Sequence, residues 1–379
     1  YAGIFFEPRL LSAINSPNKY FYTQERTLTR KKAYFINGGA GRVVASIPAF
    51  EKLYETDKDF IIVCEGGMDF YKGHPVLHEL AYDNWHKNLF KDYIKDRDCF
   101  SPEPYRVWEY YNQKCSLAQA FDIAINNEGL RELTDPTIHM NKQEMVQGFK
   151  VIEEIKAMTK KDKVVVFQPF GRTAENMGDF VIDSTSRSFH LNDVIRICKD
   201  LRDDYAVVVM SEFPITIEET PTVPIAIPQI SDVRVWSSII QIADHFIGCD
   251  SLGQHMAKAL GTTCTSVIGS TYPINISYPD SPDFDIVDLG EGRRKFSPIR
   301  LTMEDAVERF NDEVMELNDE SFKKIITSVR KRLGKPRSYT GNYVAQQQEG
   351  EVCPTHGVVH SNGVTHGSQS AQILGRTGK

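Results

Sequence analysis

The sequence predicts an α/β protein built from two doubly wound domains, each with a parallel sheet. Short apolar runs alternate along the chain with helical patterns of about 10–12 residues, which is typical of βαβ units. Several runs end in glycine or small polar residues, as strands do where ligands bind at the carboxyl edge of a parallel sheet. The length of 379 residues suits two or three domains of roughly 100–200 residues each.

The front half opens with a βαβ unit. Residues 33–37 (AYFIN) form a short apolar run that ends in the glycine turn 38–41 (GGAG). Apolar residues at helical spacing follow, and residues 60–67 (FIIVCEGG) give a second strand that ends in glycines. We therefore predict an N-terminal domain over residues 33–160, preceded by an extension over residues 1–32.

The rest of the front half contains two predicted helices. Residues 116–126 and 142–160 show helical patterns, and the KKDK that follows the second helix marks the domain boundary. Residues 68–115 are rich in aromatic, histidine and charged residues and show no period. No element is predicted there.

The rear half, residues 161–335, alternates strands and helices more regularly. The predicted strands are 164–167, 206–210, 223–227, 245–249, 264–269 and 285–289, and the predicted helices are 191–201, 235–245, 252–260, 302–317 and 319–333. This series predicts a doubly wound domain. From residue 336 the composition shifts to Gly, Ser, Gln, Thr and His, which predicts a tail over residues 336–379 that is disordered or folds only on a partner.

Composition and charge exclude several classes of function. The formal net charge is −7 and 41% of the residues are hydrophobic, which is ordinary for a globular protein with buried cores. The acidic excess argues against nucleic-acid binding as the main activity, because that needs a cationic face. No apolar run approaches the roughly 18 residues of a membrane span. The seven cysteines, an odd number, favour reduced thiols and a cytoplasmic location.

Four strand ends carry candidate site residues. They are 38–42 (GGAGR), 170–173 (FGRT), 211–213 (SEF) and 248–255 (GCDSLGQH). The first lies in the front half and the other three lie in the rear half. Two sheets whose ligand-binding edges face each other would form a cleft between them.

The fourth strand end gives the sharpest signal. Asp250 and Ser251 end a strand, and Ser251 is placed to cap the helix that follows. The N–H groups of residues 252–254 would then point into the cleft, where a helix N-terminus binds anions. Gly253 would let a diphosphate approach the backbone, and His255 could donate to a phosphate or sugar oxygen. The alternative is an Asp-Ser cap with a histidine that faces the core.

A longer stretch around this strand end resembles a known family. Residues 243–273 (ADHFIGCDSLGQHMAKALGTTCTSVIGSTYP) are similar to the signature of the heptosyltransferase family of bacterial glycosyltransferases. That signature runs as an apolar strand, Asp-Thr/Ser, two small or apolar residues, any residue, His, an Ala-rich helix, Leu-Gly, an apolar strand, Gly-x-Thr and Pro. Residues 33–53 resemble that family's first strand, glycine turn and helix. Residues 164–173, 188–201 and 206–212 follow the order of its nucleotide-binding domain.

The resemblance implies two Rossmann-like domains that face each other across a cleft, the GT-B arrangement. The rear domain would bind a nucleoside diphosphate sugar, and the front domain would bind an acceptor that the sequence does not identify. Enzymes of this family invert the anomeric centre and need neither a metal nor another cofactor. Carried over residue by residue, the donor site would comprise Arg172, Thr173, Arg187, Ser211, Glu212, Asp250, Ser251, Gly253, Gln254 and His255. The loop on the acceptor side would comprise Gly39, Gly41 and Arg42.

The residues of this implied donor site have different roles. Arg172 and Thr173 would line the phosphate side, and Glu212 would meet the ribose or the base. Arg187 lies near the position where the family carries a basic residue that neutralises the leaving diphosphate.

The front turn departs from the family pattern. The family usually has an acidic residue after the turn glycine, as general base for the acceptor hydroxyl, but this chain has Arg42 there. A guanidinium group cannot take up a proton near neutral pH. The base would then come from Glu65 or Asp69, or the chain has lost catalysis, since a general base contributes about 10²–10⁴-fold to a rate.

Other interpretations compete with a glycosyltransferase. One is a structural or interaction protein with a decayed active site, which assembles through the N-terminal extension or the C-terminal tail. An oxidoreductase is disfavoured because GGAG is not GxGxxG, and an epimerase is disfavoured because no Tyr-x-x-x-Lys pair follows a suitable strand. Packing or flexible roles are preferred over metal binding for two groups of residues, namely His74, His78 and His86, and Cys353, His356, His360 and His366.

Overall fold

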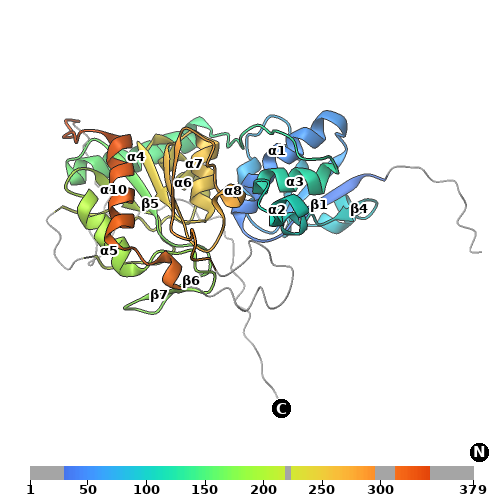
Figure 1. The fold of residues 1–379 in the computed structure, drawn as a ribbon. Helices are drawn as coiled ribbons and strands as arrows, with labels where there is room; N and C mark the ends of the chain where they lie inside the picture. The colour runs from blue at the N-terminus through green and yellow to red at the C-terminus, as the bar shows by residue number, and fades with distance from the viewer. Residues whose placement is uncertain (1–29, 218–222, 295–311, 342–379) are drawn as a thin grey trace, which may run out of the picture.

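The computed structural model describes residues 30–217, 223–294 and 312–341. Within them the chain forms two α/β units, each built on a parallel sheet, and residues 127–141 link the units without helix or strand (Figure 1). The predicted fold class is confirmed. Most of the predicted extension and tail lies outside the described residues, as does the predicted helix 302–317 up to residue 311.

The front sheet has the strand order β3-β2-β1-β4, and every neighbouring pair is parallel. Its strands are β1 (Lys32–Ile36), β2 (Phe60–Cys64), β3 (Ala81–Asp83) and β4 (Asp98–Phe100). Helices α1 (Ala40–Thr56) and α3 (Leu117–Asn126) pack together over one face of this sheet. The predicted βαβ unit is confirmed, because β1 and β2 pair in parallel on either side of α1 in the sequence.

Short elements fill residues 68–115, where the sequence shows no period. Besides β3 and β4 they are η2 (Met68–Tyr71), η3 (His78–Leu80), η4 (Phe90–Ile94), η5 (Pro104–Arg106) and α2 (Trp108–Tyr111). Each has three to five residues. A segment that short completes too few turns or alternations to display a hydrophobic period.

The rear sheet has the strand order β11-β10-β9-β5-β8, again with parallel pairs throughout. Its strands are β5 (Val164–Gln168), β8 (Ala206–Val209), β9 (His245–Gly248), β10 (Cys264–Ile268) and β11 (Phe284–Asp288). One face is covered by α4 (Lys142–Thr159), α6 (Val233–Ile242) and α7 (Leu252–Leu260), and the other by α5 (Leu191–Leu201) and α10 (Asp319–Leu333). Successive residues of β5 alternate between these two cores, as the pleat of a strand requires.

Three smaller elements complete the rear unit. They are the antiparallel hairpin β6 (Ala174–Asn176) with β7 (Val181–Asp183), the short helix α8 (Pro273–Ile276) and η6 (Asp312–Met315). The predicted strand 223–227 is wrong, because only Ala226 forms an isolated bridge, with Val208. Pro224 and Pro228 bracket that bridge, and proline has no N–H to donate to a sheet ladder.

Helix α4 packs with the rear unit although it precedes residue 160. Its main partner is α6, and the two helices approach so closely that a Cβ atom at Gly148 would lie 2.3 Å from Ser238 Oγ. Glu144 of α4 also pairs with Arg234 of α6, at 2.7 Å. The domain boundary at residue 160 stays a prediction, and the packing places α4 on the rear sheet.

The two units are held against each other by specific contacts. Asn275 of α8 donates from Nδ2 to the carbonyl oxygens of Tyr110 and Cys115 in the front unit, at 2.9 Å each. The linker is tied to α7, since Ile138 N donates to Ala259 O at 3.4 Å. Figure 1 shows α8 at the boundary between the two units.

None of the helices in the described part of the chain has the length and apolar character that a bilayer crossing requires. The six cysteines in this part are free thiols. Burial raises the pKa of Cys115 and Cys198 to about 12, so these two behave as packing residues and not as nucleophiles.

Candidate active site

The carboxyl edges of the two sheets meet where α1 and α7 begin. A Cβ atom at Gly41 would lie 3.2 Å from His255 Cδ2 and 3.6 Å from Leu252 Cα. A larger side chain at residue 41 would therefore press the two units apart. The sequence prediction that the two ligand-binding edges face each other agrees with this geometry.

Asp250, which follows β9, organises the rear edge. It is 6% exposed, and its Oδ2 accepts a hydrogen bond from Thr271 Oγ1 at 2.8 Å and lies 3.8 Å from Arg187 Nη1. Burial would lower the pKa of Arg187, but the charges of Asp250 and Asp183 outweigh it and raise that pKa. Arg187 is thus a permanent, positioned cation at the junction.

Asp183 anchors the loop that carries Thr173 and Arg187. Its buried carboxylate accepts hydrogen bonds from Thr173 Oγ1 and Ser188 Oγ, both at 2.6 Å. Thr185 donates to it from N and Oγ1, and the Thr185 hydroxyl accepts from Arg187 Nε at 2.8 Å. Burial alone would raise the pKa of Asp183, but these hydrogen bonds and the charge of Arg187 lower it. The loop is therefore fixed around an ionised carboxylate.

The N-terminus of α7 differs from the sequence prediction. Ser251 occupies the cap position, but its hydroxyl makes no capping bond, and the Gly253 N–H donates to Gln168 Oε1 at 2.8 Å. A Cβ atom at Gly253 would lie 2.3 Å from Phe246 Cζ, so packing against β9 explains the glycine without a diphosphate. Gln254 is fully buried, and its Oε1 accepts from a serine of β10. The prediction is corrected for the Gly253 N–H, which Gln168 takes, and for the Gln254 side chain, which faces the core; an anion site at the neighbouring amides of residues 252 and 254 stays a prediction.

His255 presents one ring nitrogen to the junction. Burial lowers its pKa to about 4, with Asp250 opposing that shift and Arg187 adding to it. Its Nδ1 lies 2.9 Å from Tyr278 Oη, and burial raises the pKa of Tyr278. The phenol therefore stays protonated and can donate to Nδ1, and a ring that accepts this bond carries its proton on Nε2. That nitrogen faces the front turn, because a Cβ atom at Gly41 would lie 3.8 Å from it.

Arg172, Ser211 and Glu212 follow β5 and β8 at the same edge. Arg172 is exposed and reaches toward the front turn, where its Nη1 would lie 4.0 Å from a Cβ atom at Gly39. Ser211 Oγ donates to Phe213 O at 2.7 Å and so shapes its own turn. Glu212 is exposed beyond β8. Of these three residues, Arg172 is the one whose side chain lies close to the front unit, beside Gly39.

The front turn carries a carboxylate, but not at residue 42. Gly38 N donates to Glu65 Oε2, which places the exposed Glu65 side chain at the end of β2, beside the glycine turn. Arg42 turns toward its own unit, with its guanidinium carbon 5.0 Å from the Tyr105 ring centroid and Nη1 3.5 Å from Glu103 Oε1. Arg42 therefore stabilises the front unit, and Glu65 is the carboxylate that lies at this edge.

Asp69, the other acid candidate, is directed elsewhere. Its Oδ1 lies 2.5 Å from Lys72 Nζ, and its carbonyl oxygen accepts from Arg234 Nη1 at 3.4 Å. Glu65 is the candidate that contacts the glycine turn.

Sequence reasoning misses three residues that organise the rear edge. Gln168 ends the buried strand VVVFQ, Asp183 opens the hydroxyl-rich stretch DSTSRS, and Thr271 is the threonine of the Gly-x-Thr segment. The signal for each is a polar residue directly after a strand or among hydroxyl residues. That signal does not say which distant group the side chain will meet.

The described residues include no group of three or more His, Cys, Asp or Glu side chains that could hold a metal ion. Among the metal-ligand candidates, His78 begins η3 and His86 follows β3, both in the front unit. The tail group of Cys353, His356, His360 and His366 lies outside the described residues.

No protein-family model matches the sequence, and no curated protein matches it in sequence. Solved structures do match. A glycosyl transferase family 9 protein from Veillonella parvula gives a TM-score of 0.55 at 11% identity, over 80% of this chain and 97% of that one. The ADP-heptose LPS heptosyltransferase II of E. coli gives 0.54 at 12% identity, over 80% and 98%. The chain has the heptosyltransferase fold.

A third structure extends this comparison. The dodecameric iron-containing heptosyltransferase TibC of enterotoxigenic E. coli, in complex with ADP-D-β-D-heptose, gives a TM-score of 0.51 at 11% identity, over 80% of this chain and 77% of that one. The family resemblance read from the sequence is confirmed for the fold, which is GT-B with two Rossmann-like domains. At such low identities the likeness establishes the heptosyltransferase fold alone.

Proposed function

We propose that this chain is a glycosyltransferase that moves a sugar from a nucleoside diphosphate sugar to the hydroxyl group of an acceptor. Two proteins with the same fold carry ADP-heptose in their descriptions, which supports a nucleotide sugar as donor. In this proposal the reaction inverts the anomeric centre and uses no metal or other cofactor.

The observation that carries the proposal is a pair of guanidinium groups at the junction. Arg187 is positioned by Asp250 and Thr185, and Arg172 makes no hydrogen bond or ion pair within the described residues. His255 Nε2 faces the same space. Two cations and an N–H donor opposite a glycine turn suit a diphosphate, whose negative charge grows as the bond to the sugar breaks.

Glu65 would act as the general base. The acceptor hydroxyl would give its proton to the Glu65 carboxylate while its oxygen bonds to the anomeric carbon. The bond from that carbon to the diphosphate breaks in the same step and releases a nucleoside diphosphate. Because Gly38 N binds Oε2, the other carboxylate oxygen remains available for the proton. Asp69, which is paired with Lys72, is the weaker candidate.

Nucleotide binding tests the proposal directly. ADP, UDP, GDP, CDP and dTDP are titrated against the wild-type protein while its Tm is measured. Arg172→Gln removes an exposed cation that supports no fold contact. Arg337→Gln is the matched control, since Arg337 is also an exposed arginine and lies beside Asp162, at the opposite end of β5. We expect at least one nucleotide to raise the Tm, with affinity about tenfold lower in Arg172→Gln and unchanged in the control. Stabilisation by none of the five would reject the proposal.

A second candidate is a protein of this fold that binds a nucleotide without catalysis and acts in an assembly. Arg42 at the front turn favours it, because that residue cannot accept a proton. Assembly through residues 1–32 or 336–379 remains a prediction. Nucleotide binding without donor hydrolysis or transfer, together with a larger species in which those ends resist proteolysis, would favour this candidate.

A further inference from the structure

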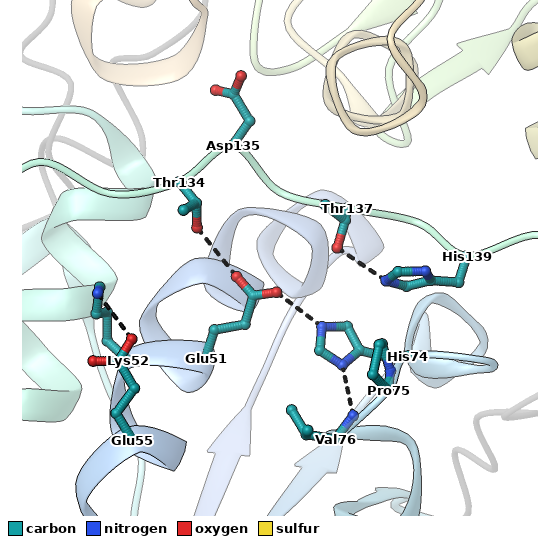
Figure 2. Close-up of a pocket in the computed structure, with 10 residues that line it drawn as sticks. All are labelled: Glu51, Lys52, Glu55, His74, Pro75, Val76, Thr134, Asp135, Thr137 and His139. Carbon is teal, nitrogen blue, oxygen red and sulfur yellow. Dashed lines mark hydrogen bonds and ion pairs between the residues drawn. The ribbon is translucent and has the colours of Figure 1, made fainter.

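A second candidate site lies on the front unit, away from the junction. A cavity of about 460 Å³ opens between the C-terminal half of α1, the loop after η2 and linker residues 134–139. Figure 2 shows the 10 residues that line it, and these include two histidines and three carboxylates. None of them belongs to the donor or acceptor residues described above.

A buried histidine–glutamate pair forms one side of the cavity. His74 is 2% exposed, and its Nδ1 accepts hydrogen bonds from the N–H groups of Val76 and Leu77 at 3.3 and 3.2 Å. The ring proton is therefore on Nε2, which lies 3.0 Å from Glu51 Oε1. The other oxygen of Glu51 accepts from Thr134 Oγ1 at 3.2 Å (Figure 2). Each oxygen of the fixed Glu51 carboxylate keeps a lone pair for a ligand.

The linker supplies further acceptors. Thr137 Oγ1 and His139 Nε2 lie 3.3 Å apart beside the His74 ring. Burial lowers the pKa of His139, the neighbouring His74 lowers it further, and Glu51 opposes the shift. His139 is therefore neutral at pH 7, and its Nε2 is engaged by Thr137 Oγ1, whose oxygen keeps a lone pair for a ligand.

The cavity carries an excess of negative charge. Among its lining residues, Glu55 pairs with Lys52 at 2.9 Å, and Asp135 pairs with Lys258, just outside the lining, at 2.8 Å. Within the described part of the chain, Glu51 has no lysine or arginine partner and is balanced only by hydrogen bonds. One carboxylate at the wall is thus left for a ligand of opposite charge.

We propose that this cavity binds a small organic cation that carries a primary ammonium group. An ammonium group has three N–H donors and no acceptor, which matches the Glu51 carboxylate and the hydroxyl oxygens of Thr134 and Thr137. A bare metal ion fits less well, because both nitrogens of His74 are already engaged. The volume also suits a molecule of several non-hydrogen atoms.

Occupancy of this cavity would act on the joint between the two units. Helix α1 carries Glu51 at the cavity, and its first turn touches α7 at the junction. The linker on the opposite wall is bonded to the rear unit, from Ile138 to Ala259 and from the His139 carbonyl to Arg234. A cation that bridges Glu51 and the linker would stabilise this joined arrangement.

Direct binding tests the proposal on the full chain. Ethanolamine, putrescine and glucosamine are the ammonium probes, and ethylene glycol, 1,4-butanediol and glucose are the neutral counterparts, all at one ionic strength. Calorimetric titration should show saturable, millimolar binding of at least one ammonium probe and of no neutral counterpart. In histidine side-chain NMR spectra, the resonances of His74 and His139 should shift on titration, while that of His245, buried in the rear sheet, should not. Absence of saturable binding by all three probes would overturn the proposal.

Two variants locate the binding. Glu51→Gln keeps the size of the side chain and removes its charge, and it should weaken binding about tenfold or more. Thr137→Val keeps the shape of the cavity and removes one acceptor, and it should weaken binding less. Glu79→Gln, a front-unit control whose side chain is 84% exposed, should bind like the wild type. Equal affinity in wild type and Glu51→Gln would contradict the site. Nucleoside diphosphates titrated into the same samples report on the junction separately.

Discussion

The rear and front edges of the junction are built in different ways. On the rear edge, the buried carboxylate of Asp183 accepts hydrogen bonds from Thr173, Thr185 and Ser188, and the buried carboxylate of Asp250 accepts one from Thr271 and pairs with Arg187. On the front edge, the exposed Glu65 accepts one backbone bond, and Arg42 packs on an aromatic ring. The rear edge is therefore preorganised for a fixed ligand, whereas the front edge is lightly held. In the proposed reaction, the donor would bind the fixed rear edge and the acceptor would bind the front edge.

The largest effect is expected at the front edge. If Glu65 takes the acceptor proton, Glu65→Gln should lower kcat by about 10²–10⁴-fold and leave nucleotide affinity unchanged. The measurement is release of nucleoside diphosphate from the donor sugar nucleotide. Asp69→Asn is the matched control and should retain most of the activity, because Asp69 is paired with Lys72. An unchanged kcat in Glu65→Gln would show that Glu65 is not the general base.

The rear edge should depend strongly on Asp183. Asp183→Asn replaces a carboxylate that accepts several bonds with an amide that must also place two N–H donors in a buried site. We expect the free energy of unfolding in urea to fall by about 2–4 kcal/mol. Glu103→Gln, which removes the half-exposed partner of Arg42 at the front edge, should cost less than about 1 kcal/mol. Equal losses of unfolding free energy in the two variants would show that the rear edge is no more tightly held than the front edge.

The pH dependence of stability should report on His255. Its pKa is lowered by burial to about 4 in the folded protein, against about 6.5 in an unfolded chain. Between these values the unfolded chain binds a proton that the folded protein does not, so stability falls as pH falls, by at most about 1.4 kcal/mol per pH unit. Urea unfolding at a series of pH values should show a shallower slope for His255→Gln and the wild-type slope for His78→Gln, on the front surface. A wild-type slope in His255→Gln would show that the ring does not stay neutral.

Two glycines give the smallest and most closely matched comparison. Gly253→Ala would place a Cβ atom 2.3 Å from Phe246 and 2.4 Å from Gln168 Oε1, and Gly41→Ala would place one 3.2 Å from His255. The first should cost about 2 kcal/mol of unfolding free energy, and the second less than about 1 kcal/mol. Urea unfolding of both variants measures the difference. A reversed order would mean that the packing of α7 on β9 relaxes more easily than the contact between Gly41 and His255.

The sequence predicts the regular part of the fold well, because each element carries its own period. Helix α5 is predicted and observed over residues 191–201, and β9, α7 and β10 agree within one residue or so. The short elements of residues 68–115 carry no such signal. Helix α4 is recognisable from the sequence, but Gly148 packs against Ser238, which lies 90 positions further along the chain. Which sheet a helix covers is decided by contacts of that kind.

The candidate site is predictable in place and not in detail. The strand ends that carry Asp250 and Arg172 reach the junction, as the rule for parallel sheets requires. The partner of the Gly253 N–H is a glutamine 85 positions away, so the composition of the α7 segment could not reveal that the amide is taken. The aromatic environment of Arg42 likewise comes from a segment without a period. Side-chain pairing across the fold is the information that a local pattern lacks.

Because α4 packs against α6, the position of a cut decides whether each unit can be expressed as a separate polypeptide. A cut after residue 160 would remove α4 from the rear polypeptide and expose the side of α6 that α4 buries. The front polypeptide would then carry α4 with its apolar face exposed to water. A rear polypeptide begun at Asn141 retains the helix together with its capping box. A front polypeptide ended near Asn127 retains α1, α3 and the whole of its sheet.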